Sequence, residues 1–154
     1  MINALLWFCA LGCGLMAGLY FAFSAFIMRA LEKLGPAAGA AAMNSMNTTI
    51  LRSLFMPLFM LTSFGALTLA TLGAFNWQRP GAWLWVAGGL TYFAGMFLVT
   101  MLFNVPLNNR LAASGPAVDD IWRHYLVAWT RWNHVRTLTS LLAAALFTAA
   151  LLCR

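Results

Sequence analysis

The sequence predicts an all-α integral membrane protein, a single domain (residues 1–154) built as an up-and-down bundle of four transmembrane helices. Hydrophobic residues make up 63% of the chain and charged residues only 8%, whereas soluble domains carry about 25% charged residues. Four apolar runs, none with an internal Asp, Glu, Lys or Arg, approach or exceed the roughly 20 residues that cross the hydrocarbon of a bilayer. They cover about 4–28, 54–75, 82–103 and 137–153.

Breaks between these runs predict where the helices end. Gly35-Pro36 and Gly115-Pro116 are strong turn signals, and Asn76–Pro80 makes the third connection. Pro is tolerated at the first position of a helix because its missing N–H would be unpaired there anyway. Each Gly-Pro is therefore expected to be an elbow beyond the membrane on one side, with helix ends near Leu34, Pro36, Ala113 and Pro116.

Prolines and small residues refine the packing. Pro57 and Pro106 are expected to kink their helices near an interface. The first helix repeats small residues that let helix backbones approach closely. We expect this row to pack inside the bundle, and association of copies into an oligomer is the alternative. The row is Ala10, Gly14, Gly18 and Ala22.

The basic residues favour one orientation. The net charge is +6, but no basic run could follow the phosphates of a nucleic acid. Positive residues favour the cytoplasmic side of a membrane, so we expect both termini outside the cytoplasm, in a bacterial inner membrane. The elbow side holds Arg29, Lys33, Arg52, Arg110, Arg123, Arg131 and Arg136, and the other side only Arg79 and Arg154.

Metal-binding patterns are weak. Cys9 and Cys13 could share a helix face with Met16 and bind a soft metal, but cysteine also serves as a small apolar filler in buried positions. His124 is expected to pair with Asp120 on a helix surface. No recognisable two-histidine or cysteine-pair spacing predicts a metal site, and neither haem nor a metal is excluded as a cofactor.

The stretch 129–136 concentrates polar and aromatic residues in an otherwise apolar chain. It holds two Trp, two Arg, an Asn and a His. On a helix, Trp129, Trp132, Asn133 and Arg136 share a face, whereas His134 points elsewhere. Further polar side chains come from the other helices: Ser24, Asn44, Asn47, Thr48, Arg52, Asn104 and Asn108.

Two interpretations of this polar set stay open. Unpaired amides near hydrocarbon cost several kcal/mol each, by order of magnitude, so they must pair or enclose something polar. In the structural interpretation, Asn47, Asn104 and Asn133 join the helices and the aromatic residues form an interfacial belt. In the functional interpretation, they surround a pocket with an aromatic wall of Trp129, Trp132, Phe21 and Phe23.

Such a pocket suits a flat aromatic or quinone-like ligand. His134 would act as the base, since imidazole exchanges protons near neutral pH. Asn104, Asn133 or Arg136 would hold the resulting enolate. Asn47, Asn108, Trp129, Trp132 and Ser24 would contact the substrate.

Four segments resemble, in order, the anthrone oxygenase-like family of small membrane proteins. They are residues 18–28 (GLYFAFSAFIM), 42–47 (AMNSMN), 104–108 (NVPLN) and 129–137 (WTRWNHVRT). The resemblance implies four transmembrane helices and oxidation of an anthrone to an anthraquinone by O₂, with no well-established cofactor. By motif match it implies roles for Asn47, Asn104, Asn108, Asn133, His134 and Arg136.

The sequence thus leaves two functions. The first is a membrane oxygenase that acts on a flat phenolic or quinone-like molecule, by base-assisted enolate formation and reaction with O₂. The alternative is a non-enzymatic membrane protein: a binder of a small molecule, lipid, haem or metal, or an accessory subunit. In both, the lipid bilayer is a partner.

Overall fold

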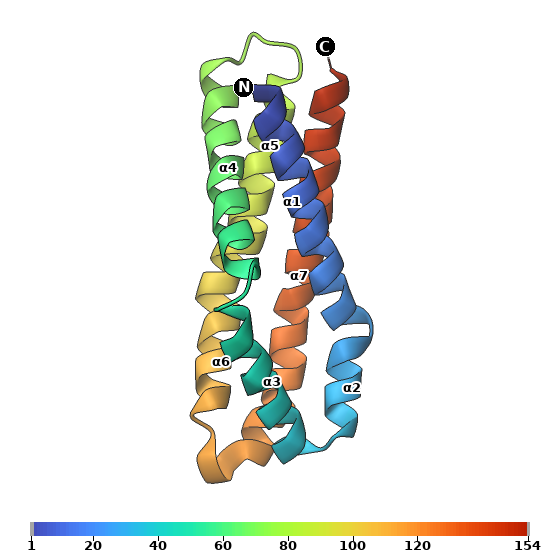
Figure 1. The fold of residues 1–154 in the computed structure, drawn as a ribbon, viewed down its shortest axis with the longest axis vertical. Coiled ribbons are helices and arrows are strands. Elements are labelled where there is room, and N and C mark those ends of the chain that lie inside the picture. The colour runs from blue at the N-terminus through green and yellow to red at the C-terminus, as the bar shows by residue number, and fades with distance from the viewer. Residues whose placement is uncertain (1, 154) are drawn as a thin grey trace.

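The computed structural model describes residues 2–153 as four helical columns and contains no strand in that range (Figure 1). The columns are joined by tight connections, and two of them contain π-helical segments. Their elements are α1 (Ile2–Ala22), π-helix η1 (Phe23–Ile27) and α2 (Met28–Lys33); α3 (Pro36–Ile50) and α4 (Phe55–Phe75); α5 (Ala82–Tyr92), π-helices η2 (Phe93–Leu98) and η3 (Thr100–Asn104) and α6 (Val105–Ala112); and the 3₁₀ turn η4 (Gly115–Ala117) with α7 (Val118–Leu152).

The columns alternate in direction, so the predicted four-helix up-and-down bundle is confirmed. N and C lie at one end of the molecule in Figure 1, here named the terminal end, and both Gly-Pro turns lie at the opposite, elbow end. Toward the terminal end α1, α4, α5 and α7 pack in a ring, and toward the elbow end α2, α3, α6 and α7 pack together. Four helices are long and apolar enough to cross a membrane: Ile2–Lys33, Phe55–Phe75, Ala82–Ala112 and Gly115–Leu152.

The elbows form where glycine permits them. Gly35 and Gly115 adopt positive φ angles of 82° and 48°, a region that side chains with a Cβ rarely enter. Pro36 then opens α3, while Pro116 lies in the 3₁₀ turn that leads into α7. The helix ends predicted from these dipeptides agree with the structure to within about two residues.

The second column departs from the prediction. A kink was expected at Pro57, but the helix ends at Ile50 and restarts at Phe55, so Pro57 lies in the first turn of α4. Proline is accommodated there because the first N–H groups of a helix lack intrahelical partners. Pro106 similarly occupies the first turn of α6, directly after η3.

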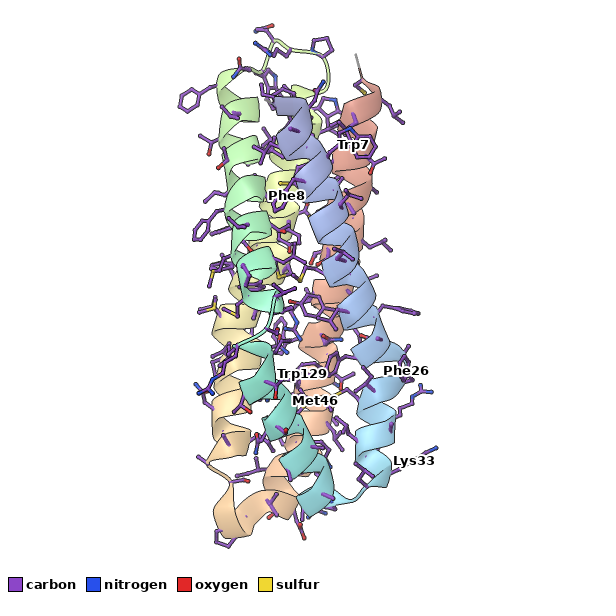
Figure 2. All side chains as sticks on the ribbon, viewed as in Figure 1. Trp7, Phe8, Phe26, Lys33, Met46 and Trp129 are labelled. Atoms are coloured by element: carbon purple, nitrogen blue, oxygen red, sulfur yellow. The ribbon has the colours of Figure 1, made fainter. Side chains whose placement is uncertain are left out.

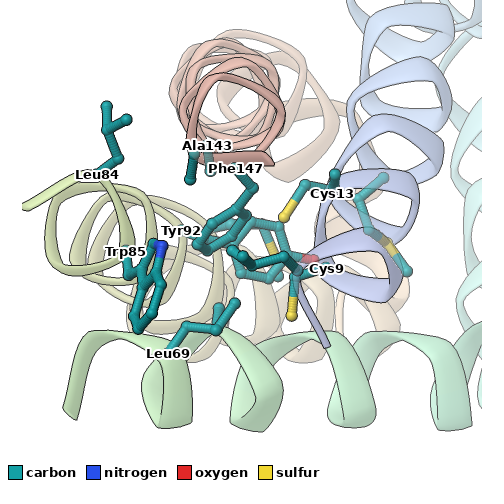
Figure 3. Packing of buried hydrophobic residues seen from close by; sticks show 14 of the residues in the cluster. Cys9, Cys13, Leu69, Leu84, Trp85, Tyr92, Ala143 and Phe147 are labelled. Atoms are coloured by element: carbon teal, nitrogen blue, oxygen red, sulfur yellow. The ribbon is translucent and has the colours of Figure 1, made fainter. Parts of the chain in front are cut away.

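Apolar side chains pack tightly in the terminal half. Figure 3 shows Cys9 and Cys13 of α1 among the residues of this core, with Tyr92 and Phe147. Both thiols and the Met16 side chain are buried in the cluster. No group of three His, Cys, Asp or Glu residues within 2–153 is placed to hold a metal, and the three sulfur side chains pack in the apolar core.

Two sequence predictions about contacts are wrong. Gly14 and Gly18 do not pack inside the bundle: both are exposed, and a Cβ at either position would meet nothing within 4 Å. Asp120 does not pair with His124, because it forms an ion pair with Arg123 at 2.6 Å. Arginine supplies a fixed charge and a longer reach at a neighbouring helix position.

Candidate functional site

A cavity of about 440 Å³ lies where the two halves of the bundle meet. Its walls come from α1 and η1, α3, the start of α4, η3 and α6, and α7. Figure 2 places Met46 of α3 beside Trp129 of α7 at this level. Most lining side chains are apolar; the polar or aromatic ones are Tyr20, Phe23, Asn44, Asn47, Thr48, Phe55, Phe59, Thr100, Asn108, Asn109, Trp129 and Arg136.

Arg136 is the charged group of this cavity. Its side chain is only 4% exposed. Nη2 donates to Asn133 Oδ1 at 2.8 Å and Nη1 to Thr100 Oγ1 at 3.4 Å. Its Cζ lies 4.3 Å from the ring centroid of Tyr20 and 4.9 Å from that of Trp129, so the guanidinium is held between two aromatic faces.

No carboxylate balances this charge. The three acidic residues of the chain are Glu32, Asp119 and Asp120, all near the elbow turns. Within residues 2–153 the only ion pair is the exposed one between Asp120 and Arg123. A buried cation without a partner loses its hydration uncompensated, a cost of several kcal/mol by order of magnitude.

Asn133 connects Arg136 to the opposite side of α7. While its Oδ1 accepts from Arg136, its Nδ2 donates to Tyr20 O at 2.7 Å and to Ser24 Oγ at 2.8 Å. Ser24 Oγ also lies 2.9 Å from His134 Nδ1. Four sequence-predicted residues are therefore joined in one chain of contacts, from Arg136 through Asn133 and Ser24 to His134.

The two ends of this series of contacts, Arg136 and His134, have different surroundings. Arg136 lines the cavity, whereas Asn133 and Ser24 lie behind its wall. The His134 side chain is exposed on the outer surface of the bundle and does not line the cavity. Within residues 2–153 the imidazole is thus connected to the cavity only through Ser24 and Asn133.

Several buried polar atoms of the cavity wall lack a partner in the described chain. They include three N–H donors, on Arg136 Nε, Trp129 Nε1 and Asn47 Nδ2, and one acceptor, Asn44 Oδ1. A buried polar atom left unpaired costs about 1–3 kcal/mol. The excess of donors favours a ligand that brings acceptor oxygens, above all a negatively charged one.

The aromatic wall is only partly the predicted one. Trp129 and Phe23 line the cavity with ring centroids 5.4 Å apart. Trp132 instead stacks on Phe103 at 3.7 Å, away from the cavity, and Phe21 is 62% exposed. Helical spacing placed Trp132 on the Arg136 face, but its ring turns toward the third column.

The remaining amides divide between cavity and packing. Asn47 and Asn108 line the cavity, and Asn108 Oδ1 accepts from Tyr125 OH at 2.8 Å. Asn104 is buried next to the wall and donates through Nδ2 to Trp129 O at 3.3 Å. The sequence predicted that these residues lie in one region, but not which of them line the cavity and which lie behind the lining residues.

Among the cavity residues that contact Arg136, Tyr20 and Thr100 were not predicted from the sequence. Tyr20 supplies one of the rings that flank Arg136, and Thr100 accepts its Nη1 hydrogen bond. Tyr20 lies one turn before Ser24 on the same helix face, a spacing that could have indicated it. Thr100 opens π-helix η3, and such distortions often occur at functional sites. The sequence signal nearby is Pro106, whose missing N–H cannot bond to the carbonyl of Leu102 within η3.

Fold and site define a small helical membrane protein with an aromatic-walled cavity that contains a buried arginine. The chain belongs to the anthrone oxygenase family: the family model described as anthrone oxygenase matches residues 46–146. The family resemblance found in the sequence is thereby confirmed. Neither the curated proteins nor the solved structures compared with the chain include a significant match.

Proposed function

We propose that the protein is a membrane oxygenase that binds a flat phenolic ketone of the anthrone type as its enolate and lets this anion react with O₂. One observation carries the proposal: Arg136 is buried, has no carboxylate partner within residues 2–153, and lines a cavity walled by aromatic and aliphatic side chains. Membership of the anthrone oxygenase family supports the same reaction class.

The energetics favour an anionic ligand. The rings of Tyr20 and Trp129 contribute cation–π attraction of about 2 kcal/mol where the cation is desolvated. That is less than the penalty of several kcal/mol for burying the guanidinium. An enolate oxygen at Arg136 supplies the missing charge, and binding the anion more tightly than the neutral ketone promotes loss of the proton.

The reaction needs no other oxidant. The ketone loses a proton from its CH₂ carbon, and the enolate is held by Arg136. That carbon forms a bond to O₂, and the peroxide takes up a proton. The same carbon then loses its second hydrogen as a proton while the O–O bond breaks, which leaves a C=O group and releases hydroxide. Each O₂ thus gives one oxygen to the quinone and one to water.

Other predicted residues support this arrangement in the proposal. Asn133 orients Arg136, and Ser24 orients Asn133 in turn. Asn47 and Asn108 contact the polar edges of the substrate, and Trp129 contacts its face. Asn104 fixes the backbone of α7 at Trp129, and Trp132 packs behind that wall. His134 lies outside the cavity and acts in the proposal by positioning Ser24, which in turn contacts Asn133.

One observation favours the second candidate, a non-enzymatic binder of a flat anion. No His, Asp or Glu lines the cavity within the described part of the chain, so no side chain there is an evident base. Proton loss from the substrate must then use water or occur before entry. Binding without turnover is the outcome that would distinguish this candidate.

For the location we propose a bacterial inner membrane, with both termini outside the cytoplasm and the elbow end inside. The excess of Arg and Lys on the elbow side supports this orientation.

The proposal is tested with the protein in nanodiscs and dithranol, a dihydroxyanthrone. Turnover is followed as O₂ uptake and as the absorbance of danthron, the corresponding anthraquinone, above the protein-free rate. Arg136→Met should lower kcat/KM by about 100-fold or more, as expected for loss of a main charge-stabilising group. Arg131→Met is the matched control, because Arg131 is exposed on the same helix, and should retain turnover.

Full turnover by Arg136→Met would refute the assignment of the oxyanion to this residue. Danthron binding that depends on Arg136, with no O₂ uptake above the protein-free rate, would instead support the binder.

A further inference from the structure

The cavity has its opening on the side of the bundle. Five of its lining residues are exposed: Ala112, near the elbow turn, and four that lie at the surface between the second and third columns, Thr48 and Leu51 on one side and Met101 and Asn109 on the other. Leu51 is 62% exposed and Met101 44%. These four residues are named the mouth.

The break in the second column explains why the bundle does not close here. α3 packs against α2, α6 and α7, whereas α4, after the break, packs against α1, α5 and η2. The second column therefore keeps the first and third columns as neighbours but packs closely against α7 only before the break, and all the residues between Ile50 and Phe55 are exposed. The cavity reaches the surface along this seam.

The mouth lies at the edge of the apolar zone. The runs 54–75 and 82–103 both end at this level, and exposed Arg52 and Arg110 flank it. Arginines at the ends of membrane helices extend to the headgroups. The polarity of the mouth changes along the membrane normal. Apolar Leu51 and Met101 lie toward the hydrocarbon, and polar Thr48 and Asn109 lie toward the elbow end.

We propose that the ligand enters and leaves sideways, from the lipid leaflet on the elbow side, between Leu51 and Met101. This proposal rests on the proposed function and deepens it: the substrate class is one that partitions into the bilayer with its ionisable oxygen at headgroup level. A flat apolar molecule concentrates there, and sliding inward through the mouth brings its oxygen toward Arg136 without exposure of its rings to water.

The first test measures the rate of entry. Danthron is delivered from protein-free vesicles to the protein in nanodiscs, and binding is followed by the visible absorbance change in a stopped-flow instrument. Leu51→Trp should slow kon by about tenfold, within the range over which kon varies among related complexes, with koff falling in parallel. Leu15→Trp is the matched control, because Leu15 is 63% exposed on lipid-facing α1, and should leave both rates unchanged.

Met101→Trp repeats the test from the other side of the mouth, and Asn109→Trp probes its polar rim. Slowing by Leu51→Trp or Met101→Trp but not by Asn109→Trp supports entry from lipid. Slowing by Asn109→Trp alone overturns the proposal in favour of entry from water.

A second test does not need the ligand. Spin labels are placed at Leu51→Cys, Met101→Cys and Asn109→Cys in a Cys153→Ala background, because Cys153 is exposed while Cys9 and Cys13 are buried. Labels at positions 51 and 101 should collide more often with O₂ than with a water-soluble nickel chelate. The label at position 109 should collide more often with the chelate than with O₂. Equal access of the chelate to all three positions overturns the lipid-facing mouth.

The failures are distinguishable. If wild-type protein does not bind danthron, the proposed function is refuted, and this inference with it. If it binds but both mouth variants keep wild-type rates, only the sideways entry is refuted.

Discussion

The terminal and elbow halves of this bundle are built on different principles. In the terminal half, regular α-helices approach closely where glycines face a neighbour, as at Gly65 beside Cys9 and Gly89 beside Ala66. The elbow half begins at π-helices η1 and η3 and has a broken column and a cavity, whose wall holds four buried polar atoms without partners among the described residues. The terminal half includes π-helix η2 and four such atoms of its own, on Thr62, Trp85, Tyr92 and Ser140, none of which lines the cavity. One half is close-packed and the other leaves space.

This difference indicates a division of labour. Close packing of apolar side chains supplies most of the stability of a protein interior, and in lipid it also drives helix association. A cavity with an unbalanced cation lowers stability, so it is tolerated only where another region compensates. We therefore expect substitutions in the terminal half to affect folding and those around Arg136 to affect ligand binding.

The largest effect should come from filling a close contact in the terminal half. A Cβ at Gly89 would lie against the carbonyl oxygen of Ala66 and 2.7 Å from Ala70 Cβ. Because backbone cannot move aside cheaply, Gly89→Ala should lower the free energy of unfolding by about 3 kcal/mol. Thermal unfolding in nanodiscs measures it.

Gly18→Ala is the control, because Gly18 also lies in a regular α-helix, α1. A Cβ there meets nothing within 4 Å, and alanine favours a helix over glycine by about 1 kcal/mol. Its melting temperature should be unchanged or slightly higher. Equal destabilisation by both variants would mean that the close contact at Gly89 does not hold the terminal half together.

A smaller effect, of opposite sign, is expected in the elbow half. Arg136→Met removes a buried charge and keeps much of the side-chain volume. Replacing buried charged groups by apolar ones is often neutral or stabilising, here by about 1 kcal/mol. The same variant that loses turnover should therefore melt at the wild-type temperature or above it, measured without ligand.

A clear fall in the melting temperature of Arg136→Met would contradict this division. It would show that the contacts of Arg136 with Tyr20, Trp129 and Asn133 stabilise the bundle. The elbow half would then contribute to stability rather than lower it.

Sequence reasoning predicted the features that depend on composition and on local backbone rules. Apolar length gave the four spans, and Gly35-Pro36 and Gly115-Pro116 gave the elbows, because few residues other than glycine adopt those φ angles. Polar residues in an apolar chain gave the region of the site, since buried amides must gather.

Most of the rest depends on tertiary packing. The break after Ile50 contains Ser53 and η3 contains Leu102, the residues four before Pro57 and Pro106, where proline disfavours a regular helix. The π-helices η1 and η2 have no such signal, and helical spacing cannot say which neighbour a face will meet. Gly14 and Gly18 were thus placed inside the bundle although they face outward, and Trp132 was placed at a pocket although it stacks on Phe103.

The smallest effect is expected at His134, and it tests where the chemistry lies. Its ring is exposed and contacts Ser24 at 2.9 Å, while the cavity lies on the other side of α7. A general base must come within hydrogen-bond reach of the proton that it removes. His134→Ala should therefore lower dithranol turnover by only about threefold, which is less than 1 kcal/mol of activation free energy, through loosened positioning of Ser24 and Asn133.

His134→Gln is the matched variant, because its amide can keep a hydrogen bond to Ser24 while it cannot act as a base near neutral pH. If His134 only positions Ser24, the glutamine variant should recover wild-type turnover. A loss of about 100-fold in both variants, the size expected for a missing general base, would place proton transfer on the outer face of α7. The elbow half would then contain a second functional surface outside the cavity, at the contact between α7 and η1.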